Sequence, residues 1–248
     1  MLLHQEGCQV EMSPTLFRGL SRDNILASLK VVASSGVATP EAAHLVDVGS
    51  DAYLDLLEKE FLQASSDTVT STVRIFEGAS GSGKTHLLEL LRRKAVAAGY
   101  ATVRTTLSES LHLEDFKLIS RHILENIEGK VNGAVVRSLP DLLSRAGAAG
   151  RVRTAELESY QAPHPGFKAA CHYAAEFPLD HPDFSHLRRF LLGERISGAA
   201  LSSSGIKYVK NPLSERNAER VIRTVCSVLQ FAGFRGLALL FDENERTL

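Results

Sequence analysis

The 248-residue chain has a formal net charge of −1, with 44% hydrophobic and 23% charged residues. This composition is that of an ordinary soluble globular protein, and the charge gives no support to a nucleic-acid or membrane-surface partner. Three widely spaced cysteines argue against a disulfide framework, and no apolar stretch is long enough for a membrane span or a signal peptide, so we expect a cytoplasmic protein.

The N-terminal region, residues 1–65, is expected to be a helical lead-in to the next region. Ser21 is a candidate cap for a first helix whose apolar residues recur at helical spacing before Gly36. A second helix is expected over residues 51–62, where apolar residues recur every three or four positions.

Residues 66–107 are expected to form a strand–helix–strand unit. Residues 72–76 have the β-branched and aromatic content of a strand, and the glycine-rich run 78–85 follows directly. Residues 85–98 show the apolar face of a helix, and residues 101–107 indicate a second strand. Such a unit implies a parallel sheet with a right-handed crossover.

The middle of the chain, residues 108–210, has no strong strand signal and is expected to be a long helical insertion. Its candidate helices cover residues 114–127, 140–146, 166–176 and 186–192. The segment 145–153 contains Gly147 and Gly150 and is expected to be a flexible loop.

Residues 211–248 are expected to complete the sheet with one helix and one strand. The pair Asn211-Pro212 has the residue types of a helix start, and a clear apolar stripe follows it. Gly233 is expected to end this helix, and the apolar run 236–241 is expected to be a buried strand.

The run at residues 78–85, Gly-Ala-Ser-Gly-Ser-Gly-Lys-Thr, has the pattern of a phosphate-binding loop. Glycines allow its backbone to turn tightly, and the helix that follows adds unpaired N–H groups and a positive dipole end. Lys84 is expected to reach the β- and γ-phosphates, and the Thr85 hydroxyl to coordinate Mg²⁺. ATP with Mg²⁺ is therefore the expected ligand. The expected nucleotide contacts are Gly78, Ala79, Ser80, Gly81, Ser82, Gly83, Lys84, Thr85 and His86.

Two acidic residues follow the last predicted strand. In open α/β sheets ligands bind at the carboxyl edge of the strands, so Asp242 is expected to join Thr85 as a metal ligand. Glu243 is expected to orient and deprotonate the attacking water, and Lys84 to be the other catalytic residue. The alternative is that both acids simply begin a surface turn.

The glycine-rich run and the acidic end of the last expected strand together resemble the motifs of a known family. Residues 78–85 and 237–243 resemble the Walker A and Walker B motifs of P-loop NTPases with a catalytic glutamate, which include AAA+ and STAND ATPases. With residues 46–50 and 233–237, they also resemble the ATP-binding proteins of BREX-type phage-defence systems. The resemblance implies an α/β, three-layer P-loop NTPase fold and an ATP hydrolase or ATP-driven switch, working with partner subunits or by self-association in a larger assembly.

The same resemblance implies a further strand between the strand at 72–76 and the strand at 236–241. That strand normally follows the second motif, and this sequence ends at Leu248. We therefore expect a C-terminally truncated fragment with an incomplete sheet, in which a sensor residue and an arginine finger come from elsewhere.

Two other functions remain open from the residues alone. A small-molecule or nucleotide kinase could use the same loop, and a nucleotide-sensing module could bind without turnover. Nucleic-acid contact by a basic loop is a weaker alternative, as is a metal site among scattered histidines. The residues concerned are Arg145, Arg151 and Arg153 for the loop, and His164, Cys171, His172, His181 and His186 for the metal.

Overall fold

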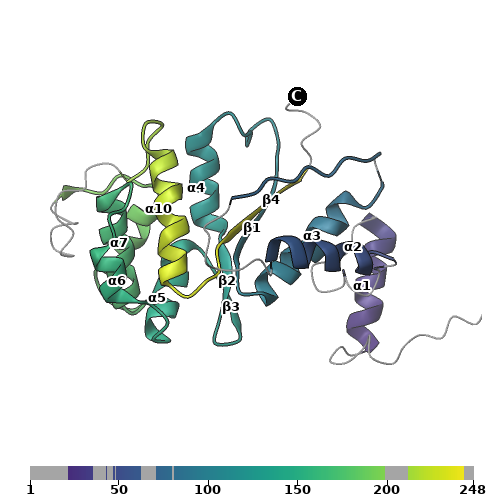
Figure 1. Cartoon of the computed structure of the whole chain (residues 1–248), viewed down its shortest axis with the longest axis horizontal. Coiled ribbons are helices and arrows are strands. Elements are labelled where there is room, and N and C mark those ends of the chain that lie inside the picture. Colours follow the sequence, from purple (N-terminus) through teal and green to yellow (C-terminus); the bar gives the residue numbers. More distant parts are fainter. Residues whose placement is uncertain are drawn as a thin grey trace, which may run out of the picture. The chain divides into compact units, whose positions relative to one another are not determined.

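The computed structural model of the chain describes residues 22–35, 43, 47, 49–62, 71–79, 81–198 and 212–242. The chain forms two compact units, Met1–Ala52 and Tyr53–Leu248. The first unit contains helix α1 (Arg22–Ser35), which agrees with the helix expected after Ser21. Ser21 itself lies outside the described residues. The second unit contains the sheet and the candidate site (Figure 1).

The second unit is a mixed α/β structure built on a four-stranded sheet with the order β3-β2-β1-β4. The strands are β1 (Ala101–Thr106), β2 (Glu128–Val131), β3 (Ala134–Arg137) and β4 (Leu237–Asp242). Strands β1 and β4 are parallel and in register from Ala101↔Leu237 to Thr106↔Asp242. The other two pairings are antiparallel. The expectation of a parallel sheet therefore holds only for β1 and β4.

The strand expected at residues 72–76 is not formed. This segment lies in no sheet, and Val73 and Ile75 are 78% and 80% exposed. Within the described residues, β4 pairs with β1 along one edge and with no strand along the other. β-Branched residues favour a strand only where they can pack on a pleated neighbour, and this segment has none.

Most of the expected helices are present in the second unit. The described helices are α2 (Asp51–Leu57), which continues as the π-helical turn η2 (Glu58–Leu62), α3 (Lys84–Ala97), α4 (Phe116–Asn126), α5 (Leu139–Ala148), α6 (Thr154–Ser159), α7 (Pro165–Glu176), α8 (Phe184–Leu191) and α10 (Ala218–Phe231). Of these, α6 was not expected from the sequence. None of the described helices is long and apolar enough to cross a membrane.

Helix α10 begins later than the sequence suggested. Its first residue is Ala218, preceded by Asn217, whose side-chain oxygen accepts a hydrogen bond of 2.6 Å from the backbone N–H of Ser214. Pro212 lies in the bend before this turn, and Asn211 lies outside the described residues. The asparagine that stabilises the turn before α10 is therefore Asn217.

The hairpin of β2 and β3 also differs from the expectation of a purely helical middle region. Asn132 and Gly133 connect the two strands with φ angles of 48° and 84°. Positive φ at both central residues is the signature of the tight type I′ hairpin turn, for which Asn-Gly is the preferred sequence. The charged and small residues of β2 leave it without a clear apolar alternation. The Asn132-Gly133 pair could nevertheless have predicted the hairpin.

Gly147 lies inside α5, so the loop expected at residues 145–153 is wrong over its first part. A Cβ atom at Gly147 would lie 1.7 Å from the backbone oxygen of Ala175 on α7. The missing side chain lets the two helices approach closely, and this packing outweighs the intrinsic helix-breaking tendency of glycine.

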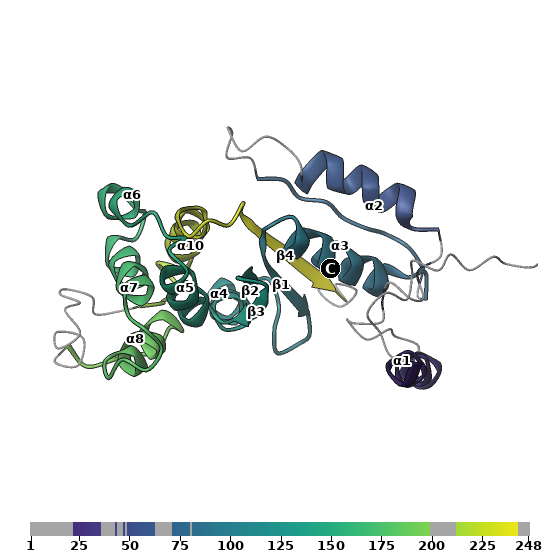
Figure 2. The same ribbon diagram turned by 90° about the horizontal axis from the view of Figure 1, so that it is seen from below.

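The sheet has different neighbours on its two faces (Figure 2). Helix α3 packs against β1 and β4 on one face. Ala101 and Val103 of β1 point to the other face and join the main hydrophobic core with residues of α4, α5 and α10. Because side chains alternate along a strand, Thr102 and Arg104 point toward α3. The α3 face therefore carries the polar groups of the candidate site.

Candidate functional site

The glycine-rich loop leads directly into α3. Gly81 and Gly83 have φ angles of 79° and 88°, and Gly83 is the residue that precedes the helix. Both residues lie in the left-handed region, which only glycine adopts without strain, so a side chain at either position would strain the backbone. The backbone N–H of Ser82 donates to the oxygen of Ala79 at 3.1 Å, which closes a turn within the loop. Ser80 lies outside the described residues.

Lys84 is the first residue of α3, and its side chain folds back over the loop. Its ammonium group donates hydrogen bonds to the backbone oxygens of Gly78 at 2.6 Å and of Ala79 at 3.0 Å. The Lys84 ammonium is thus held at the loop, where it can exchange these hydrogen bonds for contacts with an anion that binds there.

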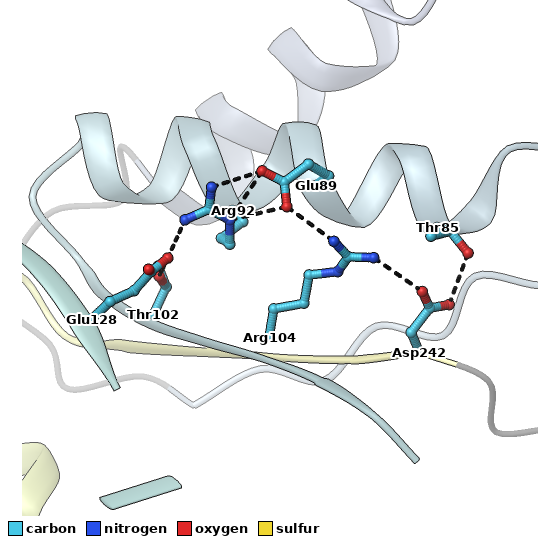
Figure 3. A network of polar contacts seen from close by, with 7 residues as sticks. All are labelled: Thr85, Glu89, Arg92, Thr102, Arg104, Glu128 and Asp242. Atoms are coloured by element: carbon cyan, nitrogen blue, oxygen red, sulfur yellow. Dashed lines mark hydrogen bonds and ion pairs between the residues drawn. The ribbon is translucent and has the colours of Figure 1, made fainter. Parts of the chain in front are cut away.

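Thr85 and Asp242 meet at the end of the α3 face (Figure 3). The Thr85 hydroxyl donates to Oδ1 of Asp242 at 3.3 Å. Asp242 is the last residue of β4 and is buried, with 7% of its surface exposed. The structure therefore brings together the two expected metal ligands, which lie in separate regions of the sequence.

The donor set of Thr85 and Asp242 fits a magnesium ion. Mg²⁺ prefers hard oxygen ligands at about 2.1 Å and usually binds through one or two carboxylates with water and phosphate completing its shell. Two such ligands at adjacent octahedral positions lie about 3 Å apart, close to the separation observed here. Thr85 and Asp242 would hold the ion, which would neutralise phosphate charge.

A cluster of charged residues surrounds this pair on the α3 face, and the sequence reasoning missed it. Arg104 of β1 contacts Asp242 at 3.4 Å and Glu89 of α3 at 3.1 Å. Arg92 of α3 binds Glu89 at 2.7 Å and also contacts Glu128 of β2. The hydrogen bond to Glu89, together with both carboxylates, raises the pKa of Arg92 despite its partial burial.

Two features of the sequence could have indicated this cluster. Glu89 lies between two leucines of α3 and is buried like them, with 2% of its surface exposed. Arg104 stands in the interior of β1 between Val103 and Thr105, which are both buried. A charge inside a buried element requires an opposite charge nearby, so each residue predicts a partner.

Two of the expected site residues cannot be placed. Glu243 and Ser80 lie outside the described residues, so the catalytic role of Glu243 stays a prediction. His86 is partly buried in the first turn of α3. The remaining expected residues, from Gly78 to Thr85, lie together at the start of α3 with Asp242 beside them.

Two of the three arginines of the expected basic loop, Arg151 and Arg153, contact other parts of the protein, and Arg145 lies in α5. The guanidinium of Arg151 lies 4.7 Å from the ring centre of Phe234 and donates to the backbone oxygen of Gly233. Arg153 donates to the oxygen of Gln230 at 3.1 Å. These contacts give both side chains a structural role.

The candidate histidines do not converge on a metal. Within the described residues, no group of three or more His, Cys, Asp or Glu side chains could hold one. His164 instead accepts a hydrogen bond from the backbone N–H of Phe167 and caps α7. The pKa of His164 is lowered, mainly because burial disfavours the charged ring.

A cavity of about 630 Å³ lies elsewhere in the second unit. Its lining residues are Lys117, Arg121, Gly193, Glu194, Arg195, Leu213, Ser214, Glu215 and Arg216. None of them belongs to the glycine-rich loop or to β4. The cavity is therefore separate from the candidate nucleotide site.

Comparison with known proteins identifies a family for this chain. Residues 19–145, just over half of the chain, match the family described as BREX system ATP-binding protein BrxC/D. The match covers the glycine-rich loop, α3 and β1, and Asp242 and Glu243 lie outside it. No curated protein and no solved structure matches the chain. The chain belongs to the BREX system ATP-binding protein BrxC/D family.

Proposed function

We propose that this chain binds ATP with Mg²⁺ through a P-loop of Walker A type at residues 78–85 and a Walker B aspartate, Asp242. The contact between Thr85 and Asp242 carries the proposal, because it joins the two motifs at one end of the α3 face. Membership of an ATP-binding protein family supports the same ligand.

In this proposal each residue has a defined task. The backbone N–H groups of the loop and the start of α3 receive the phosphates, since an unpaired helix N-terminus favours negative charge. The Lys84 ammonium moves from the loop oxygens to the β- and γ-phosphates, which are stronger acceptors than carbonyls. Thr85 and Asp242 hold the Mg²⁺, directly or through water.

We further propose that the protein hydrolyses ATP and that Glu243 activates the water. A carboxylate one residue after the metal-binding aspartate can reach a water molecule positioned beside the γ-phosphate. Glu243→Gln is expected to retain ATP binding and to lose turnover, since only the proton transfer needs the carboxylate. Phosphate release at the wild-type rate would exclude Glu243 as the base.

Two alternatives keep the same site but change its output. A kinase would transfer phosphate only when an acceptor is present, so phosphate release with and without acceptor separates it from a hydrolase. A nucleotide sensor would bind ATP tightly and show no turnover under either condition. The acidic pair at residues 242–243 favours hydrolysis, because a phosphate-transferring kinase does not need a second carboxylate to activate water.

The nucleotide core would consist of residues 66–107 and 211–248, with residues 1–65 leading into it and residues 108–210 inserted. Membership of the BREX system ATP-binding protein family supports a role in phage defence, and we propose that the chain acts there with other subunits or with copies of itself. The second edge of β4, which has no strand partner among the described residues, is a site where such a subunit could pair.

The experiment that tests ATP binding is calorimetry on the wild type and on Lys84→Ala in the presence of Mg²⁺. The variant is expected to lose at least tenfold in affinity, because a charge-assisted phosphate contact is removed. Lys130→Ala is a matched control, since Lys130 is an exposed lysine on β2. Equal affinity of Lys84→Ala and the wild type would remove the phosphate-binding role of the loop.

A further inference from the structure

Arg104 and Asp242 lie on the same face of the sheet. Thr106 of β1 pairs with Asp242 of β4, and Arg104 comes two residues before Thr106. Because side chains alternate between the two faces along a strand, both Arg104 and Asp242 project toward α3. The register of β1 and β4 therefore places Arg104 beside the candidate metal site.

The two oxygens of Asp242 have different partners (Figure 3). Oδ1 accepts the Thr85 hydroxyl at 3.3 Å, while Oδ2 faces the Arg104 guanidinium at 3.4 Å. The side chains of Asp242 and Arg104 are 7% and 24% exposed, so little water screens their interaction. The arginine thus fixes the rotation of the carboxylate and neutralises part of its charge.

Glu89 holds the other side of Arg104. Its Oε2 atom lies 3.1 Å from Nη1 of Arg104, and its side chain is only 3% exposed. Glu89 is also bound by Arg92, whose guanidinium reaches Glu128 on β2. Arg104 is therefore shared between Glu89 and Asp242, and Glu89 would keep Arg92 as a cation if Arg104 moved toward Asp242.

We propose that Arg104 is a positioning residue that sets the Mg²⁺ affinity of the nucleotide site by competing with the cation for the Asp242 carboxylate. This inference rests on the proposed role of Asp242 as a metal ligand. A guanidinium cannot lose its proton, so it remains a fixed positive charge beside a site that must accept a divalent ion. A cation bound between Thr85 and Asp242 would share the carboxylate with Arg104.

The cluster makes two predictions of opposite sign. Arg104→Gln removes the competing charge, so the Mg²⁺ concentration that gives half-maximal ATP binding should fall about tenfold. Glu89→Gln removes the carboxylate that draws Arg104 away from Asp242, so that concentration should rise severalfold. Both substitutions nearly preserve or reduce side-chain volume, and neither introduces a new charge.

The test is a Mg²⁺ titration of ATP binding to the full chain, followed by calorimetry or by a fluorescent ATP analogue. ATP affinity in EDTA is measured in parallel and should change less than about twofold in Arg104→Gln, because Arg104 is proposed to act on the carboxylate and not on phosphate. Arg121→Gln is the control, since Arg121 pairs with Glu125 on the exposed surface of α4. It should leave the titration unchanged.

Each outcome decides the proposal. An unchanged or raised Mg²⁺ requirement in Arg104→Gln overturns it, and so does a large loss of ATP affinity in EDTA, which would make Arg104 a phosphate ligand. If Arg104→Gln does not fold, Glu89→Gln decides, because an unchanged or lowered requirement in that variant also overturns the proposal. If the wild type itself shows no Mg²⁺-dependent ATP binding, the proposed function fails before this inference is reached.

Discussion

The Thr85 hydroxyl lies 3.3 Å from Oδ1 of Asp242, although 157 positions separate the two residues along the chain. Thr85 lies in the first turn of α3, and Asp242 ends β4, which is parallel to β1. Because α3 packs on both strands, its N-terminal turn and the carboxyl end of β4 meet at the same edge of the sheet. Ligands of open α/β sheets bind at this edge.

The conformation of Gly83 yields a prediction that separates binding from folding. Gly83 and Gly150 both have positive φ, 88° and 64°, and a Cβ atom at either would meet nothing within 4 Å. Each Gly→Ala substitution should therefore cost about 1 kcal/mol in unfolding free energy through backbone strain alone. Only Gly83→Ala should also weaken ATP binding, because only Gly83 shapes the loop. Chemical denaturation and calorimetry measure the two effects, and equal ATP affinities of the two variants would contradict the assignment.

The close approach of α5 and α7 predicts a strong stability effect at Gly147. A Cβ atom there would lie 1.7 Å from the backbone oxygen of Ala175, so the helices must separate. Gly147→Ala should lose about 2 kcal/mol or more in unfolding free energy, even after the gain in helix propensity. Gly198→Ala is the control, since a Cβ atom at Gly198 has no neighbour within 4 Å. Urea unfolding compares the variants, and a Gly147→Ala protein as stable as this control would refute the packing argument.

The cap of α7 should make the stability of the protein depend on pH. Burial lowers the pKa of His164 below its ordinary value of about 6.5, and the positive charge of Arg220 acts in the same direction. The folded state therefore favours the neutral ring, whose Nδ1 accepts the Phe167 N–H. This stabilisation is fully present above about pH 6.5 and is lost as the pH falls through the lowered pKa.

His164→Asn tests this linkage, because asparagine can still cap the helix but does not titrate. The difference in unfolding free energy between pH 7 and pH 5 should be smaller in the variant than in the wild type. His122, whose pKa is also lowered by burial, is present in both proteins and cancels in the comparison. Identical pH dependence in the two proteins would show that His164 is not the titrating group.

The local sequence was a good guide wherever one element determined its own structure. The apolar stripe of α3 and the glycine at its end predicted the helix, and Gly99 ends it with a φ of 88°. The apolar run before Asp242 likewise predicted β4, but the expectation that this strand is buried is wrong for Leu239, which is 38% exposed. Both signals are patterns of apolar side chains within one segment. They can be read without knowing which other element the segment packs against.

The sequence was a poor guide wherever the structure depended on a distant neighbour. Residues 72–76 have strand composition but lie in no sheet among the described residues, because nothing there pairs with them. Gly147 is helical because α7 lies against it. The Arg104–Asp242 ion pair joins two strands far apart in the chain, so only their register reveals it.

A double-mutant cycle on Thr85 and Asp242 tests the central claim that the two residues form one Mg²⁺–nucleotide site. The variants are Thr85→Val, which removes the hydroxyl at nearly constant shape, Asp242→Asn, and the two combined. The measurement is the Mg²⁺-dependent part of ATP affinity, obtained by calorimetry with Mg²⁺ and with EDTA. If both residues hold the same ion, each single variant should lose about tenfold or more. The double variant should lose little beyond the worse single one, a coupling of about 1 kcal/mol or more. Strictly additive losses, or an Asp242→Asn protein with wild-type Mg²⁺ dependence, would contradict the account.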